Sequence, residues 1–123
     1  MLEKRILIVD DEPDLLETIQ ATLEMEGYEC LVAYDGFRGL DRARSEKPDL
    51  IVLDVMLPGM NGYKICRLLK FDEQYKHIPI IMLTAEAQEK DRLIGEETGA
   101  DYYMTKPFAP DKLIAKVAEL LET

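Results

Sequence analysis

The chain has 123 residues, of which 47% are hydrophobic and 33% charged, and its formal net charge at pH 7 is −10. This length suits one domain over residues 1–123 whose core needs no disulfide or structural metal. The negative charge excludes binding to nucleic acid or anionic lipid that is driven by charge attraction. No apolar run reaches the roughly 18 residues that span a membrane and no signal-peptide pattern opens the sequence, so we expect a cytoplasmic protein without membrane contact.

Strand-like and helix-like segments alternate along the whole sequence. Three of the strand-like segments contain the apolar runs ILIV, LIVL and IIML, which are typical of central parallel strands covered on both faces. The alternation predicts an α/β fold with right-handed crossovers: a doubly wound, five-stranded parallel sheet of order 2-1-3-4-5, the (βα)5 arrangement of flavodoxin-like folds. In chain order the expected elements are strand Arg5–Val9, helix 14–26, strand Glu29–Ala33, helix Gly36–Glu46, strand Leu50–Asp54, helix 63–71, strand 80–84, helix 86–97, strand 102–104 and helix Pro110–Leu121.

The expected helices differ in the strength of their apolar pattern. Helix Pro110–Leu121 carries a full apolar stripe at helical spacing. Segment 86–97 has few apolar residues and is interrupted by Gly95, which costs about 1 kcal/mol relative to Ala. A thinly packed helix of this kind is expected either to act as a moving part or to be an ordinary exposed helix.

Acidic residues gather where two neighbouring strands end. Asp10 and Asp11 close the first strand and Asp54 closes the third, and these strands flank the point where the strand order reverses. Three carboxylates at one edge of the sheet repel one another, and they predict a site for a hard divalent cation such as Mg²⁺. Glu12 follows directly, and we interpret it as complementing the dipole of the helix that starts there.

Two further polar residues at this edge suit phosphoryl transfer. A carboxylate can act as a nucleophile and form an aspartyl phosphate, which then needs charge neutralisation. The ammonium of Lys106, after the fifth strand, and the hydroxyl of Thr84, at the end of the fourth, would supply it. Each residue alone has an ordinary explanation as a turn residue or a surface charge, and it is their coincidence at one edge that favours function.

Four segments carry a family resemblance. ILIVDDEP, LIVLDVMLPGMNG, PIIMLTA and GADYYMTKPF stand in this order, each at its proper place in the strand–helix series. With them the chain resembles, essentially from end to end, the receiver (CheY-like) domains of two-component response regulators. The resemblance implies a phosphoprotein in which Asp54 is the phosphoacceptor. It also implies a Mg²⁺ site made by Asp10, Asp11, Asp54 and the backbone carbonyl of Met56.

The resemblance assigns roles to the other site residues as well. Thr84 and Lys106 would stabilise the phosphoryl group, and Tyr103 would turn inward as Thr84 moves, so that these two act as the switch. The bond between Lys106 and Pro107 is expected to be a cis peptide. Met56 and Glu86 stand where side chains are expected to tune the lifetime of the phosphoryl group.

The function that the resemblance implies is a switch in phosphorelay signal transduction. A sensor histidine kinase, a phosphotransfer protein or a small phosphodonor would phosphorylate Asp54, and the chain would catalyse only its own phosphorylation and dephosphorylation. The surface of helix 86–97, strand 102–104 and helix Pro110–Leu121 would then change and control an output domain or target protein. A phosphorylation-dependent homodimer is also expected, with Arg92, Asp101 and Lys116 as either cross-dimer ion pairs or merely solvated charges.

Alternatives remain open for what the chain controls and for the class of protein to which it belongs. The chain could be a free-standing regulator, or a receiver taken from a longer transcription factor or cyclic-dinucleotide synthase. A structural interaction domain that does not use phosphorylation would have no need of the five polar site residues, Asp10, Asp11, Asp54, Thr84 and Lys106.

Three classes of phosphate-handling protein fit the sequence poorly. Dehalogenase-like phosphatases need an acid at the position of Met56, and flavodoxins need a neutral phosphate-binding loop at the position of Asp11 and Glu12. Nucleotide hydrolysis at a P-loop is excluded because the motif is absent from the sequence.

Overall fold

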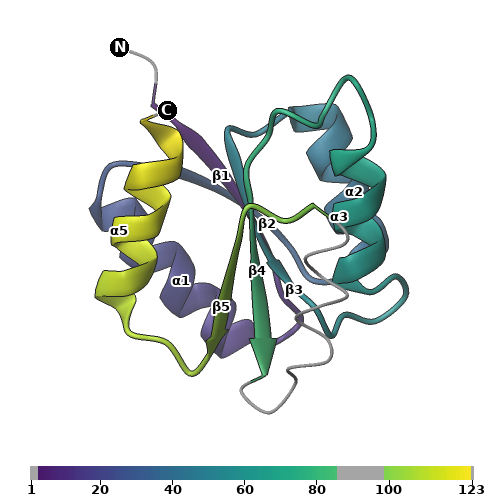
Figure 1. Ribbon diagram of the computed structural model, residues 1–123. Helices are drawn as coiled ribbons and strands as arrows, with labels where there is room; N and C mark the ends of the chain where they lie inside the picture. Colours follow the sequence, from purple (N-terminus) through teal and green to yellow (C-terminus); the bar gives the residue numbers. More distant parts are fainter. Residues whose placement is uncertain (1–2, 86–98, 123) are drawn as a thin grey trace.

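The computed structural model describes residues 3–85 and 99–122, and these residues form a parallel sheet with helices on both faces (Figure 1). The expected helix 86–97, with Glu86 and Arg92, lies outside the described residues. The described elements are β1 (Arg5–Val9), α1 (Pro13–Met25), β2 (Glu29–Ala33), α2 (Gly36–Glu46), β3 (Leu50–Asp54), α3 (Gly62–Lys70), β4 (Ile80–Ala85), β5 (Tyr102–Lys106) and α5 (Pro110–Leu121).

The sheet has the order β2-β1-β3-β4-β5 and every neighbouring pair is parallel, as predicted. Two strands run further than expected, because the β4–β5 ladder continues through Thr84 opposite Thr105 and Ala85 opposite Lys106. Lys106 is therefore the last residue of β5 and not part of the following loop. The main-chain pairing holds it at the same sheet edge as the ends of β1 and β3.

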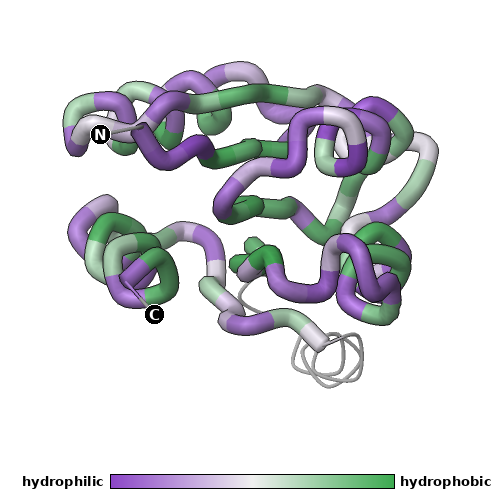
Figure 2. Tube along the Cα trace, turned by 90° about the horizontal axis from the view of Figure 1, so that it is seen from above, coloured by the Kyte–Doolittle hydropathy of each residue, from purple (hydrophilic) through white to green (hydrophobic). Residues whose placement is uncertain are grey.

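The core lies in two layers, one on each face of the sheet. Successive strand residues alternate between the layers: Leu7 and Val9 of β1 pack on the α2 and α3 side, while Ile6 and Ile8 pack on the α1 and α5 side. Figure 1 shows α1 and α5 together on one side of the sheet and α2 and α3 on the other. Figure 2 shows the apolar colour following the strands through the middle of the molecule. Burial on both faces explains why the central strands are apolar throughout.

Two of the three charges that were considered for dimer contacts form ion pairs within the chain. Asp101 Oδ2 lies 2.9 Å from Lys70 Nζ and accepts a 2.8 Å hydrogen bond from the Ile80 amide. Lys116 Nζ lies 2.8 Å from Glu119 Oε2. The interpretation of Asp101 as a merely solvated charge is therefore wrong, because this carboxylate joins α3 to the starts of β4 and β5. No helix among the described residues combines the length and apolar character that a membrane crossing requires.

Candidate functional site

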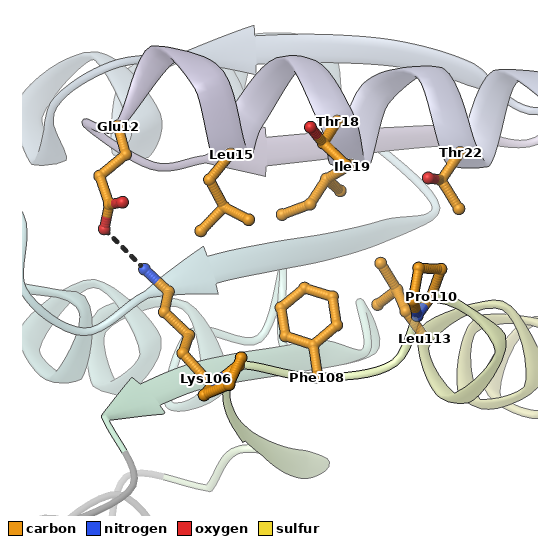
Figure 3. Close-up of a pocket in the computed structure, with 10 residues that line it drawn as sticks. Glu12, Leu15, Thr18, Ile19, Thr22, Lys106, Phe108, Pro110 and Leu113 are labelled. Atoms are coloured by element: carbon orange, nitrogen blue, oxygen red, sulfur yellow. Dashed lines mark hydrogen bonds and ion pairs between the residues drawn. The ribbon is translucent and has the colours of Figure 1, made fainter.

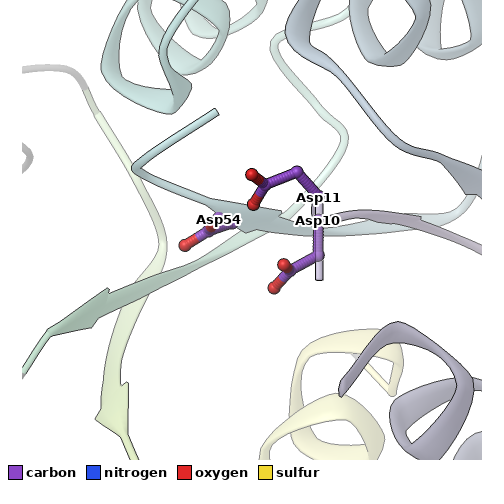
Figure 4. Close-up of side chains that lie close together, drawn as sticks. All are labelled: Asp10, Asp11 and Asp54. Carbon is purple, nitrogen blue, oxygen red and sulfur yellow. The ribbon is translucent and has the colours of Figure 1, made fainter. Parts of the chain in front are cut away.

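The three predicted acids converge at the carboxyl edge of the sheet (Figure 4). Asp10 directly follows β1, Asp11 is the next residue, and Asp54 is the last residue of β3. One carboxylate oxygen from each lies within 4.8 Å of the other two. Asp10 is fully buried and Asp54 is 4% exposed, whereas Asp11 is exposed to solvent. The parallel pairing of β1 with β3 thus produces the acidic cluster that the sequence predicts.

Lys106 projects into this cluster from the end of β5. Its Nζ atom lies 3.1 Å from Asp54 Oδ1 and 3.2 Å from Asp10 Oδ2. The second oxygen of Asp10, Oδ1, accepts a 3.0 Å hydrogen bond from the Glu12 amide, so both oxygens of this buried carboxylate are held. One ammonium therefore faces two buried carboxylates, and the exposed Asp11 adds a third negative charge beside them.

Glu12 also reaches this lysine, a contact that the sequence does not predict. Its Oε1 lies 3.4 Å from Lys106 Nζ, as the dashed line in Figure 3 marks. Glu12 stands at the N-cap of α1, but its side chain makes no capping hydrogen bond there. The dipole interpretation was thus incomplete. The contact could not be inferred from the sequence, because Glu12 and Lys106 stand 94 positions apart and only the fold brings them together.

The charges in the cluster shift the acidity of two groups. Burial, followed by the nearby Asp10 carboxylate, raises the pKa of Asp54 from 3.8 to about 6, although Lys106 acts in the opposite direction. Burial lowers the pKa of Lys106, but the attraction of Asp54 and Asp10 outweighs it and raises that pKa above its ordinary value. The site keeps an excess of negative charge at neutral pH.

This donor set fits a hard divalent cation. The cluster offers three carboxylates, oxygen ligands of the kind that Mg²⁺ and Ca²⁺ prefer, and two of them are already desolvated. Among residues 3–85 and 99–122, this cluster is the single group of three or more Asp, Glu, His or Cys side chains that lie close enough together to share a metal ion. A bound cation would offset the repulsion that raises the pKa of Asp54.

Two glycines hold the loop that follows Asp54. The Gly62 amide donates a 2.9 Å hydrogen bond to the Val55 carbonyl, and a Cβ at Gly62 would lie 2.9 Å from the Val55 Cα. From the start of α2, the Gly36 amide donates a 3.1 Å bond to the Pro58 carbonyl. A Cβ at Gly36 would collide with the Met60 carbonyl. The role of Gly36 could not be predicted, because nothing in the sequence reveals that α2 touches this loop.

Gly36→Ala is therefore expected to lower the free energy of unfolding by about 1–3 kcal/mol, the usual cost of overpacking a filled position. Backbone atoms of Met60, which cannot rotate away, block the new methyl group. Denaturant unfolding of the variant measures this cost. Asp41→Ala, at an exposed position of the same helix, is the control and is expected to change stability little. Equal stability of Gly36→Ala and the native chain would contradict the close contact.

The other predicted site residues lie near the cluster without joining it. Thr84 is 4% exposed and directly follows Leu83, the residue that pairs with Asp54. No hydrogen bond links its hydroxyl to any of the other site residues described here. Tyr103 is half-buried in β5 and packs against the core layer beneath α2 and α3. Met56 is 64% exposed, and the Lys106–Pro107 peptide bond is cis.

Comparison with known proteins gives consistent results. A sequence model of the response regulator receiver domain matches residues 6–118. The chain is 48% identical over 120 residues to the alkaline phosphatase synthesis transcriptional regulatory protein PhoP of Bacillus subtilis, covering 98% of this chain and 49% of that protein. The chain spans about half the length of the curated relatives it matches.

Solved structures agree along nearly the whole chain. A response regulator from Chloroflexus aurantiacus has a TM-score of 0.94 and 34% identity, covering 99% of this chain and 100% of that one. The receiver domain of the sensor histidine kinase PA1611 from Pseudomonas aeruginosa has a TM-score of 0.91 and 30% identity, with coverages of 99% and 100%. That structure holds a magnesium ion coordinated in its active site cleft.

Proposed function

The chain belongs to the response regulator receiver domain family of two-component systems, and from this premise we propose that it is a switch operated by phosphorylation of Asp54. The observation that carries the proposal is the position of the Asp54 carboxylate, which is buried beside Asp10 and 3.1 Å from the Lys106 ammonium. A purely structural acid would have no need of this surplus of negative charge. A nucleophile that accepts a metal-bound phosphoryl group does need it.

In the proposed reaction, an Asp54 carboxylate oxygen attacks the phosphorus of a phosphohistidine on a sensor kinase or phosphotransfer protein. The O–P bond forms as the P–N bond breaks, and the electron pair of the P–N bond returns to the ring nitrogen. The imidazole leaves neutral, because its other nitrogen already carries a proton in the phosphohistidine. Asp54, with a pKa of about 6, is mostly ionised at neutral pH and ready to attack. A Mg²⁺ ion held by Asp10, Asp11, Asp54 and the Met56 carbonyl would neutralise phosphoryl oxygens. The Lys106 ammonium, 3.1 Å from Asp54 Oδ1, would neutralise further charge.

The new charge then acts on Thr84 and Tyr103. The Thr84 hydroxyl, one residue beyond the partner of Asp54, moves to donate a hydrogen bond to the phosphoryl group. Tyr103, two residues before Thr105, then turns inward. The surface formed by β5, α5 and the segment 86–97 changes with it. This is a local electrostatic event that biases a two-state element.

The proposed partners are a sensor histidine kinase or phosphotransfer protein as phosphodonor, and an output domain or target protein. The name of the Bacillus subtilis relative supports transcription as the process under control. A phosphorylation-dependent homodimer, a cytoplasmic location and tuning of the phosphoryl lifetime by Met56 and Glu86 belong to the same proposal. The chain acts as a signalling protein, and its only chemistry is on itself.

Amide hydrogen exchange tests the switch. Phosphorylation with acetyl phosphate and Mg²⁺ is expected to change protection over Tyr102–Lys106, while β1 and β2 stay unchanged and serve as the internal control. Thr84→Ala is expected to accept the phosphoryl group but to show a much smaller change in β5, because the hydroxyl that couples the two is gone. Identical exchange in the phosphorylated and unmodified native chain would place the output surface elsewhere.

A further inference from the structure

Positive charge is concentrated on one side of an otherwise acidic chain. Residues 36–71, which include α2 and α3, hold seven of the 15 Lys and Arg residues but only four of the 25 Asp and Glu residues. The rest of the chain is correspondingly more negative than the total of −10. This side of the sheet is the one that α2 and α3 cover, opposite α1 and α5 (Figure 1).

The outer face of α3 carries exposed apolar side chains between these cations. Lys64, Arg67, Leu68 and Phe71 follow one another at i, i+3, i+4 and i+7, and therefore form one stripe along the helix. Leu68 is 37% exposed and Phe71 is 69% exposed. Neither is needed in the core, since the opposite stripe already fills it with Ile65, Cys66 and Leu69.

A hollow of about 720 Å³ lies along this stripe. Arg44 of α2 and the segment 72–74 complete its wall. The Arg67 guanidinium lies 5.6 Å from the centre of the Phe71 ring, close enough for a cation–π contact that keeps both side chains at the hollow. We name this surface, lined by Arg44, Lys64, Arg67, Leu68 and Phe71, the α2–α3 hollow.

The lining of the α2–α3 hollow carries three cations, Arg44, Lys64 and Arg67, against two acids, Asp72 and Glu73. The Asp72 carboxylate accepts a 2.9 Å hydrogen bond from the Gln74 amide, and Glu73 pairs with Lys76 at 2.9 Å. Within the described part of the chain, no ion pair is formed by Arg44, Lys64 or Arg67. A ligand with carboxylates would therefore find three cations without an ion-pair partner among the described residues, beside the two exposed apolar side chains Leu68 and Phe71.

We propose that the α2–α3 hollow is a docking surface for an acidic protein segment that carries apolar side chains at helical spacing. Its apolar residues would cover Leu68 and Phe71, and its carboxylates would face Arg44, Lys64 and Arg67. A long polyanion such as DNA, or an anionic membrane, would be repelled by the rest of the chain. A second copy placed symmetrically would bring cations against cations. The inference goes beyond the proposed phosphorylation switch and does not rest on it.

The test is a titration of the isotope-labelled chain with a synthetic helical peptide of Glu residues interspersed with Leu and Phe, followed by NMR. We expect chemical-shift changes at Arg44 and Lys64–Phe71, a dissociation constant of about 10–100 μM, and weaker binding at higher salt. Phe71→Ser, and separately Lys64→Glu with Arg67→Glu, are each expected to weaken binding about tenfold or more.

Matched controls lie on the opposite face of the sheet. Met25, at 86% exposure on α1, is exposed to a similar degree as Phe71, and Lys112 is an exposed cation on α5. Met25→Ser and Lys112→Glu are expected to leave the dissociation constant unchanged within about twofold, since neither lines the hollow. Because all of these positions are exposed, each variant is expected to keep the native far-UV circular dichroism spectrum.

Several results would overturn the proposal. The first is the absence of shifts at the α2–α3 hollow at millimolar peptide. The second is equal binding of a peptide in which Lys replaces every Glu, or Ser replaces every Leu and Phe. The third is binding to vesicles of anionic lipid in place of the peptide, which would assign the surface to a membrane. The fourth is self-association that Phe71→Ser abolishes, which would assign it to a second copy.

Discussion

Asp54→Asn is expected to raise the free energy of unfolding at neutral pH by about 2–3 kcal/mol. The pKa of Asp54 is about 6 in the folded chain against 3.8 for the ordinary group, because the carboxylate is buried beside Asp10. At about 1.36 kcal/mol for each pKa unit, ionising this group in the folded state costs up to about 3 kcal/mol. Asn keeps the shape of the side chain and carries no charge, so it removes this cost.

The same variant is expected to lose part of the pH dependence of stability. Between pH 3.8 and about 6 the folded chain binds more protons at Asp54 than the unfolded chain does, so the native protein loses stability as pH rises through this window. Denaturant unfolding at a series of pH values measures both effects, with Asp41→Asn on the exposed face of α2 as the control. A lower stability of Asp54→Asn at neutral pH, or an unchanged slope between pH 4 and 6, would contradict the stated electrostatics.

Lys106→Met is expected to have the opposite effect and to lower the free energy of unfolding at neutral pH by about 3 kcal/mol. Removing one partner of a largely buried ion pair leaves the other charge uncompensated, which usually costs about 3–5 kcal/mol. Here the 20% exposure of the Lys106 side chain moderates the loss. Met keeps most of the aliphatic stem, so the change reports the charge and not the packing.

A double variant separates charge from packing. If Lys106 acts mainly by compensating Asp54 and Asp10, Asp54→Asn is expected to restore much of the stability that Lys106→Met removes, and the two changes are not additive. Lys112→Met, which removes an exposed charge on α5, is expected to change stability by less than about 0.5 kcal/mol. Simple additivity in the double variant would show that Lys106 does not compensate these carboxylates.

The strand order and the acidic cluster could be predicted because both follow from local patterns and a topological rule. Apolar runs identify β1, β3 and β4, and parallel crossovers place their carboxyl ends at one edge. Asp10 and Asp54, the residues at the ends of β1 and β3, must therefore meet whatever the details of packing. The same rule brings Lys106 to the edge from β5.

Contacts between distant segments could not be predicted in this way. The reach of Glu12 to Lys106 depends on how α1 sits against the end of β5, and the fit of Gly36 against Met60 depends on the depth at which α2 packs. The longer course of β5 comes from its ladder with β4 and not from its own residues. Such features arise from tertiary packing, for which a single sequence carries no periodic signal.

Intact mass after incubation with acetyl phosphate and Mg²⁺ tests the central claim, that Asp54 accepts a phosphoryl group at a metal-dependent site. The native chain is expected to gain one phosphoryl group, and chelation of the metal should prevent the gain. Asp54→Asn should gain none, whereas Asp11→Asn, which keeps the proposed acceptor but removes a proposed metal ligand, should react much more slowly. An equal gain in Asp54→Asn, or no gain in the native chain from acetyl phosphate or from a phosphorylated histidine kinase, would contradict the account.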